Sequence, residues 1–174
     1  MEGYVVAMIR EIGLWGELLN HRTVRTVFFG GGTPSCLPTE DIAQIMQSVD
    51  SAFKIETEAE VTLESNPGDF TSDKLTTYLE SGINRLSIGV QTFDDHLLGV
   101  LGRRHTAQDA VDAYRMAQDA GFYNISIDLM YGLPDQTLEG WKSTLKKALE
   151  LQPPHISMYC LTLEEGTPFE AWVR

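Results

Sequence analysis

The alternation of apolar, β-branched runs with helical stretches constrains the fold of this 174-residue chain most strongly. The apolar runs lie at residues 24–29, 60–65, 85–91, 125–132 and 155–161. They recur roughly every 30 residues, which is the length of a βα unit. No tight hairpin signal joins neighbouring runs. The sequence therefore predicts parallel strands that are joined by right-handed helical crossovers.

Capping residues support the helices that this alternation requires. The predicted helical stretches are residues 4–20, 39–53, 71–82, 93–102, 106–121 and 137–151. Thr39 and Thr71 stand where helix N-caps are expected, and Gly82 and Gly121 stand where left-handed helix ends are expected. Pro153 follows the last helical stretch and prevents its continuation. Each crossover is thus predicted to be one ordinary helix or a pair of short ones.

The residues that follow the strands distinguish two α/β architectures. An open flavodoxin-like sheet gathers polar groups near its switch point, whereas a (β/α) barrel draws them from nearly every strand. Here every strand ends in polar or glycine residues: Gly30 to Thr33, Glu64 to Pro67, Gln91, Asp128, and Cys160 to Thr162. This pattern favours a TIM-like barrel. Five strands cannot close one, so we expect an incomplete barrel, part of a longer protein, whose open sheet edges make the isolated chain associate.

The charge balance limits the classes of partner. The chain has 25 acidic against 13 basic residues, and its net charge of -12 opposes binding to nucleic acid or to anionic membranes. No apolar run approaches the roughly 18 residues of a membrane span, and the N-terminus lacks the pattern of a signal peptide. We expect a cytoplasmic protein with a cationic or neutral small ligand, no nucleic acid partner and no membrane span.

Five segments in chain order carry a family resemblance. They are "TVFFGGGTPSCLP", "VTLESNPGDF", "GINRLSIGVQTFDDHLLGVLGRRHT", "GFYNISIDLMYGLPDQT" and "YCLTLEEGTPF". Together they resemble the radical S-adenosylmethionine (SAM) proteins of the oxygen-independent coproporphyrinogen III oxidase group, and within that group its heme-chaperone branch. The resemblance implies that residues 1–174 form the core of a partial (β/α)6 TIM-like barrel that binds SAM.

The same resemblance implies a role in heme delivery, with heme or a porphyrin and heme-accepting proteins as partners. Two other functions stay open. One is the oxidative decarboxylation of coproporphyrinogen III by an enzyme of the same group. The other is the binding of a different nucleotide-like ligand without radical chemistry. Among the four histidines, His105 beside two arginines is the candidate heme ligand within this chain, and the family's C-terminal region is the alternative.

The iron–sulfur cluster of this family has no matching ligands in the sequence. Radical SAM proteins hold a [4Fe-4S] cluster on a C-x-x-x-C-x-x-C loop after the first strand, where three closely spaced thiolates and SAM complete its coordination. Cys36 and Cys160 are the only cysteines here, and neither matches a cluster position. We therefore expect no metal site within the chain and a cluster only in the intact parent protein. The first strand with its cysteine loop and the C-terminal domain are expected to be absent.

The glycine turn at residues 30–33 is assigned by the resemblance to the methionine end of SAM. Gly31, Gly32 and Thr33 match the family turn, where absent side chains let backbone groups approach an amino-acid head group. A plain tight turn preset by Pro34 is the structural alternative.

The resemblance assigns SAM contacts to five further residues: Glu64, Gln91, Arg103, Asp128 and Thr162. The Glu64 carboxylate can accept hydrogen bonds from an amino or hydroxyl group, and the Gln91 amide suits a ribose. The arginine suits the SAM carboxylate, and the threonine lies near the adenosine. An aspartate in an apolar strand is costly unless it is paired or faces a ligand, and a ribose diol would serve. Ordinary strand-end, helix-end or structural roles are the alternatives, and no catalytic residue is assigned.

Overall fold

The computed structural model describes residues 2–69, 71–167, 169 and 170. The strands are β1 (Thr23–Phe29), β2 (Lys54–Ser65), β3 (Arg85–Gln91), β4 (Asn124–Tyr131) and β5 (His155–Cys160). The helices are α1 (Glu2–Leu18), α2 (Thr39–Ala52), α3 (Ser72–Glu80), α4 (Asp95–Val100), α5 (Ala107–Ala120) and α6 (Leu138–Glu150), with 3-10 turns η1 (Pro34–Cys36) and η2 (Pro67–Asp69).

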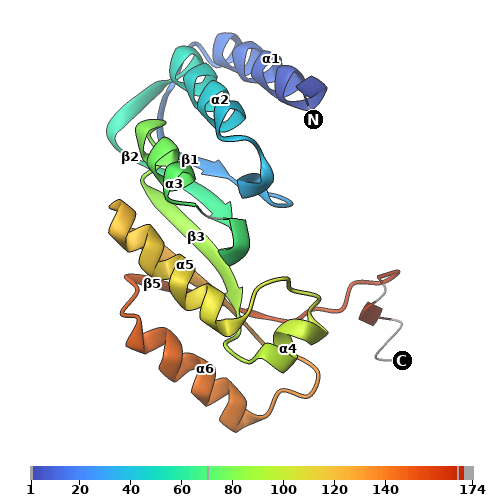
Figure 1. The fold of residues 1–174 in the computed structure, drawn as a ribbon. Helices are drawn as coiled ribbons and strands as arrows, with labels where there is room; N and C mark the ends of the chain where they lie inside the picture. The colour runs from blue at the N-terminus through green and yellow to red at the C-terminus, as the bar shows by residue number, and fades with distance from the viewer. Residues whose placement is uncertain (1, 70, 168, 171–174) are drawn as a thin grey trace.

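The five strands form one parallel sheet in the order β1-β2-β3-β4-β5. This order follows the chain without reversal, whereas a doubly wound sheet changes direction at its switch point. The helices stack along one side of the sheet from α1 and α2 to α6 (Figure 1). The prediction of an incomplete (β/α) barrel is confirmed, and the open flavodoxin-like sheet is excluded.

The two faces of the sheet differ in chemistry. Leu63, Leu86, Ile88 and Ile127 are fully buried in the core between sheet and helices. Side chains alternate along a strand, so the residues between them lie on the opposite face. On β3 this opposite face carries Ser87, which neighbours Glu64 of β2 and Ser126 of β4 in register. The helix-covered face is apolar, and the other face is free to carry polar groups.

The helix boundaries follow most of the predicted capping signals. Thr71 accepts a hydrogen bond from the backbone N–H of Lys74, and Gly121 ends α5 in a left-handed conformation with φ of 108°. Thr39 differs from its prediction, because it is the first helical residue and Pro38 occupies the N-cap position without a side-chain bond. Proline restricts the entering backbone by itself, so that end needs no hydroxyl cap.

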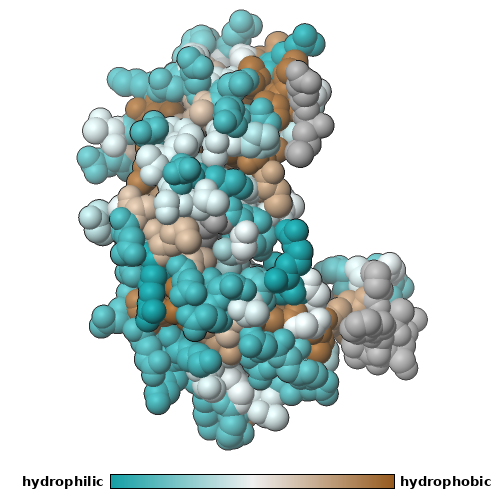
Figure 2. Space-filling view, viewed as in Figure 1, coloured by the Kyte–Doolittle hydropathy of each residue, from teal (hydrophilic) through white to brown (hydrophobic). Residues whose placement is uncertain are grey.

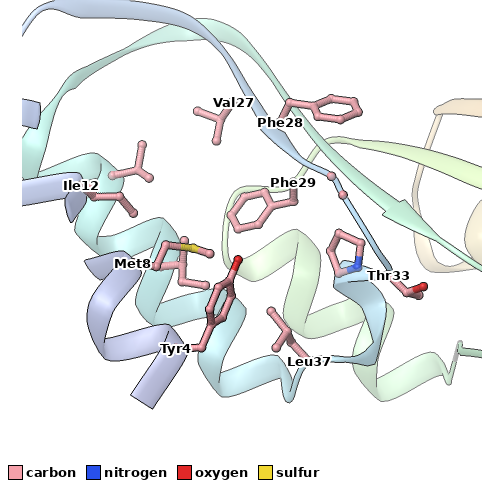
Figure 3. A pocket seen from close by; sticks show the side chains of 13 residues that line it. Tyr4, Met8, Ile12, Val27, Phe28, Phe29, Thr33 and Leu37 are labelled. Atoms are coloured by element: carbon pink, nitrogen blue, oxygen red, sulfur yellow. The ribbon is translucent and has the colours of Figure 1, made fainter. Parts of the chain in front are cut away.

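The free edge of β1 borders an apolar groove of about 420 Å³. Tyr4, Met8 and Ile12 reach into it from α1 toward Phe29 and Leu37 (Figure 3). Apolar residues also gather at the α1 and α2 end of the molecular surface (Figure 2). Within the described residues, no helix is both long and apolar enough to cross a membrane.

We expect the isolated 174-residue chain to self-associate through its open sheet edge. Phe28 on β1 is 61% exposed, and Phe28→Lys should lower the associated fraction because a charge disfavours edge pairing. Sedimentation velocity over a concentration series measures this fraction. Tyr123→Lys is the control, since Tyr123 is 88% exposed but precedes a central strand. A wild-type chain that stays monomeric would contradict the expectation.

Candidate functional site

A cavity of about 250 Å³ opens at the carboxyl ends of the strands. Its lining residues are Gly32, Thr33, Glu64, Ser65, Asn66, Gly89, Gln91, Arg103, Asp128, Met130 and Tyr159. Parallel strands bring their carboxyl ends to one edge, which is where (β/α) folds bind ligands. Residues that are far apart in sequence thus line one small, mainly polar volume.

The glycine turn after β1 is shaped by backbone conformation and by crowding at one position. Gly31 and Gly32 have φ of 79° and 67°, in the left-handed region, while a Cβ on either would meet nothing within 4 Å. At Gly30, by contrast, a Cβ would collide with the Phe28 ring and lie 3.2 Å from Oε2 of Glu64. The N–H of Gly31 donates to that same oxygen at 3.2 Å. The turn therefore fixes Glu64 at the cavity wall.

The end of β3 is irregular where it enters the cavity. Gln91 has φ of 68°, which is uncommon for a residue with a side chain, and the pairing of β3 with β4 shifts register between Ile88 and Gln91. A Cβ on Gly89 would lie 2.8 Å from Nε2 of Gln91 and 3.3 Å from Oδ1 of Asn66. Glycine at position 89 thus lets the Gln91 side chain lie across its own strand, over the cavity floor.

Arg103 brings a half-buried positive charge to the cavity. Its Nη1 donates to Oδ1 of Asn66 at 3.0 Å, and within the part of the chain that the structure describes it forms no ion pair. Burial lowers the pKa of Arg103 from its ordinary value, although arginine stays protonated in proteins. Arg104 instead is 86% exposed and lies 4.0 Å from Asp69. The charge of Arg103 is thus available to an anionic ligand group.

Asp128 is held by two serine hydroxyls. Ser87 Oγ donates to its Oδ2 at 2.7 Å, and Ser126 Oγ donates to its Oδ1 at 3.0 Å. Both serines are buried, and Asp128 itself is partly exposed at the cavity. Neutral donors of this kind stabilise a carboxylate without neutralising it. Its remaining lone pairs can accept hydrogen bonds from a ligand.

The family model of the Radical SAM superfamily matches residues 6–148. The chain belongs to the radical SAM superfamily. It is 43% identical over 168 residues to "Heme chaperone HemW" of Escherichia coli K12, covering 97% of this chain and 44% of that protein. A HemW of Synechocystis is also 43% identical, with 97% of this chain and 40% of that protein covered. The chain thus spans less than half the length of these relatives.

Solved structures agree with the family assignment. Coproporphyrinogen III oxidase (HemN) from Escherichia coli, described as a radical SAM enzyme, superposes with a TM-score of 0.86 at 32% identity. The match covers 92% of this chain and 37% of HemN. An archaeal Elp3 superposes with a TM-score of 0.73 at 19% identity, which shows the fold alone. The predicted resemblance to this group, and to its heme-chaperone branch, is confirmed.

The structure brings most of the predicted site residues of this radical SAM chain together. Gly32, Thr33, Glu64, Gln91, Arg103 and Asp128 line the cavity, and Gly31 adjoins it through its bond to Glu64. Thr162 is different. It follows β5, is exposed and does not belong to the cavity lining, so its role stays a prediction.

Five lining residues were not among the predicted site residues: Ser65, Asn66, Gly89, Met130 and Tyr159. A glycine inside an apolar strand signals a close approach, which could have indicated Gly89. Met130 lies two residues after Asp128 and so on the same face, a period-of-two signal. No local pattern indicated Tyr159, because its place depends on the pairing of β5 with β4.

The residues present do not fit an iron–sulfur cluster. Cys36 and Cys160 are both exposed free thiols, and Cys36 lies in η1 while Cys160 ends β5. Across residues 2–69, 71–167, 169 and 170, no group of three or more His, Cys, Asp or Glu side chains could hold a metal ion. A [4Fe-4S] cluster needs such a group, usually three or four thiolates.

A second cavity of about 400 Å³ adjoins the first and contains the buried His105 beside Arg103 and Arg104. Nε2 of His105 lies 3.2 Å from the carbonyl oxygen of Val90, which can only accept, so Nε2 carries the proton. Burial, and after it the positive charge of Arg103, lowers the pKa of His105 from its ordinary 6.5, against the opposing effect of the Val90 bond. The imidazole is therefore neutral at neutral pH.

We expect the pH dependence of stability to reflect His105. Its folded pKa lies below its unfolded value of about 6.5, so its stabilising contribution is complete above pH 6.5 and declines as the pH falls through the folded pKa. His105→Gln removes the titration but keeps a donor for Val90. Urea unfolding at about pH 7.5 and about pH 5.5 gives the free energy of unfolding at each pH. Its decrease toward the lower pH should be smaller in this variant than in the wild type. The exposed His96→Gln serves as control, and equal losses in wild type and His105→Gln would refute the assignment.

Proposed function

We propose that residues 1–174 form the SAM-binding core domain of a HemW-like radical SAM protein that acts in heme delivery. One observation carries the proposal. Glu64 and Arg103 line the same small cavity, yet within the described residues they form no ion pair with each other. Opposite charges that stay apart in one cavity suit a zwitterionic ligand. The amino-acid end of SAM, with its ammonium and carboxylate, is such a group.

The proposed roles follow from the donors and acceptors of each side chain. Glu64 accepts from the ammonium, while Gly31, Gly32 and Thr33 offer backbone groups to the same head group. Arg103 binds the carboxylate with a planar guanidinium. Asp128 accepts from the ribose hydroxyls, and the Gln91 amide offers both a donor and an acceptor nearby. Thr162 is proposed to approach the adenosine from the segment after β5.

We propose that the [4Fe-4S] cluster of this family belongs to the intact protein, with its cysteine ligands outside residues 1–174. HemW relatives are more than twice as long as the matched region, which leaves room for such a segment. When bound, the cluster would supply the electron for cleavage of SAM. The residues described above bind and orient SAM, and no catalytic side chain is assigned among them.

Heme or a porphyrin is the proposed cargo, and heme-accepting proteins are the proposed partners. The support is the name of the relatives, heme chaperone HemW. The net charge of -12 disfavours nucleic acid as a partner. A cytoplasmic location is also proposed, because the net charge of -12 disfavours an anionic membrane surface.

Coproporphyrinogen III oxidase activity is the second candidate, favoured by the superposition on HemN. The test uses the protein expressed over its whole reading frame with its cluster reconstituted anaerobically. It is incubated with SAM and coproporphyrinogen III, and decarboxylation is followed by mass spectrometry of the porphyrins. Decarboxylated product would establish the oxidase and refute a chaperone-only role. Absence of product, together with transfer of bound heme to an acceptor, would support the chaperone.

The SAM site predicts that Asp128→Ala and Gly32→Val each weaken SAM binding about tenfold, as expected for losing a hydrogen bond to a charged group or for straining a left-handed turn. Isothermal titration calorimetry on the reconstituted protein measures the dissociation constant. Asp112→Ala is the matched control, because Asp112 is an exposed acid on α5 away from the cavity. Thr162→Ala tests the segment after β5. Unchanged affinity in both site variants would contradict the assignment.

A further inference from the structure

Asp128 is the acceptor in a row of hydrogen bonds that crosses three strands. Ser87 on β3 and Ser126 on β4 donate to its two oxygens. Ser126 Oγ also lies 2.9 Å from Nδ1 of His155 and 3.3 Å from Oγ of Ser157, both on β5. The register supports this row, since Ser126 pairs with His155 and Asp128 pairs with Ser157. Three strands thus contribute to fixing one carboxylate.

The donor and acceptor in each hydrogen bond of the row follow from the number of protons on each group. An ionised carboxylate only accepts hydrogen bonds, so the single hydroxyl proton of Ser126 points to Asp128. Ser126 must then accept from His155, which places a proton on Nδ1 of that imidazole. Ser157 can donate to the remaining lone pair of Ser126. The order is therefore His155 to Ser126 to Asp128, with Ser87 donating from the other side.

The serines are the donors that set how the carboxylate lies. Within the described residues Asp128 forms no ion pair, so no arginine or lysine orients it. Each of its oxygens receives one hydroxyl from the strand face, which leaves the other lone pairs for the cavity that Asp128 lines. Ser126 is fully buried and Ser87 is 9% exposed, so water cannot readily replace either donor. Buried polar groups that are fully bonded hold a single geometry.

We propose that Ser87, Ser126 and His155 are positioning residues that hold the Asp128 carboxylate in the orientation required to accept the hydroxyl groups of the ligand's ribose. This inference rests on the proposed function, since it presumes that the cavity binds SAM. The three residues act through Asp128 and do not touch the ligand. Because both carboxylate oxygens already accept from the protein, Asp128 stays an acceptor, and the site selects ligands that offer hydroxyl donors.

A double-mutant cycle separates positioning from a general effect on folding. In the reconstituted full-length protein, Ser87→Ala and Ser126→Ala should each weaken SAM binding about three- to tenfold. In an Asp128→Ala background the same serine changes should cause no further loss, because the group that they orient is gone. Calorimetry gives the affinities, and urea unfolding shows whether each variant is folded. Ser81→Ala is the control, since that hydroxyl donates to the Thr77 carbonyl in α3.

His155 offers a rescue experiment at the start of the row. His155→Ala removes the Nδ1 donor and should weaken SAM binding by about threefold. His155→Asn places an amide N–H near the former Nδ1 and should restore most of the affinity. His155 is exposed, so both variants are expected to fold. A loss of folding in Ser126→Ala would still leave the Ser87 cycle and the His155 pair as tests.

The outcomes distinguish this inference from the proposed function. If Asp128→Ala leaves SAM affinity unchanged, Asp128 is not a SAM contact and the positioning role is refuted; the SAM site as a whole is refuted only if Gly32→Val also leaves it unchanged. If Asp128→Ala weakens binding but the serine variants do not, or if their losses add in full to that of Asp128→Ala, the SAM site stands and the positioning role is refuted. Equal affinities for His155→Ala and His155→Asn would remove His155 from the row.

Discussion

Parallel pairing of the five strands in chain order is the constraint on which the structure depends. It places the carboxyl end of every strand at one edge, so the glycine turn after β1, Glu64 on β2 and Gln91 on β3 meet around one cavity. Parallel pairing also requires a helical crossover between neighbouring strands, which covers one face. The position of the site therefore follows from topology before any side-chain chemistry is considered.

The apolar face supplies the stability that the polar face does not. Full burial of an aliphatic side chain contributes about 1.5–3 kcal/mol, and β3 and β4 bury Leu86, Ile88, Ile127 and Leu129 under the helices. A hydrogen bond contributes about 1 kcal/mol net, so the serine row adds less than the core does. An unsatisfied buried hydroxyl would cost about 1–3 kcal/mol, however. The serines of the row are all bonded, and the fold can tolerate a polar strand face for that reason.

The sequence predicted the topology well because it repeats local signals. Strand runs, caps such as Thr71 and Gly121, and polar strand ends each report on a few neighbouring residues. β2 was predicted too short, because its first half is not a continuous apolar run. Charged residues alternate there with Ile55, Thr57 and Ala59, a period of two that also indicates a strand.

The candidate site could be predicted only where single residues are unusual in the sequence. An aspartate within an apolar strand and three successive glycines are unusual enough to be noticed, and the family resemblance supplied the others. Tyr159 and the Ser126–His155 bond could not be predicted, because they depend on the register between β4 and β5. Serines and histidines at strand positions are common, and only the pairing shows that they converge on Asp128.

Neutral partners hold the two charges of the cavity apart. Two unit charges at 4 Å attract by about 4 kcal/mol at an effective dielectric constant of 20, which would favour a direct ion pair between Glu64 and Arg103. Instead Glu64 accepts from the Gly31 N–H, and Arg103 donates to Oδ1, the side-chain amide oxygen of Asn66. Each bond fixes a charge without cancelling it. A zwitterion that binds between them therefore need not break an existing ion pair. Breaking such a pair would weaken its binding by an amount comparable to the attraction between the two charges.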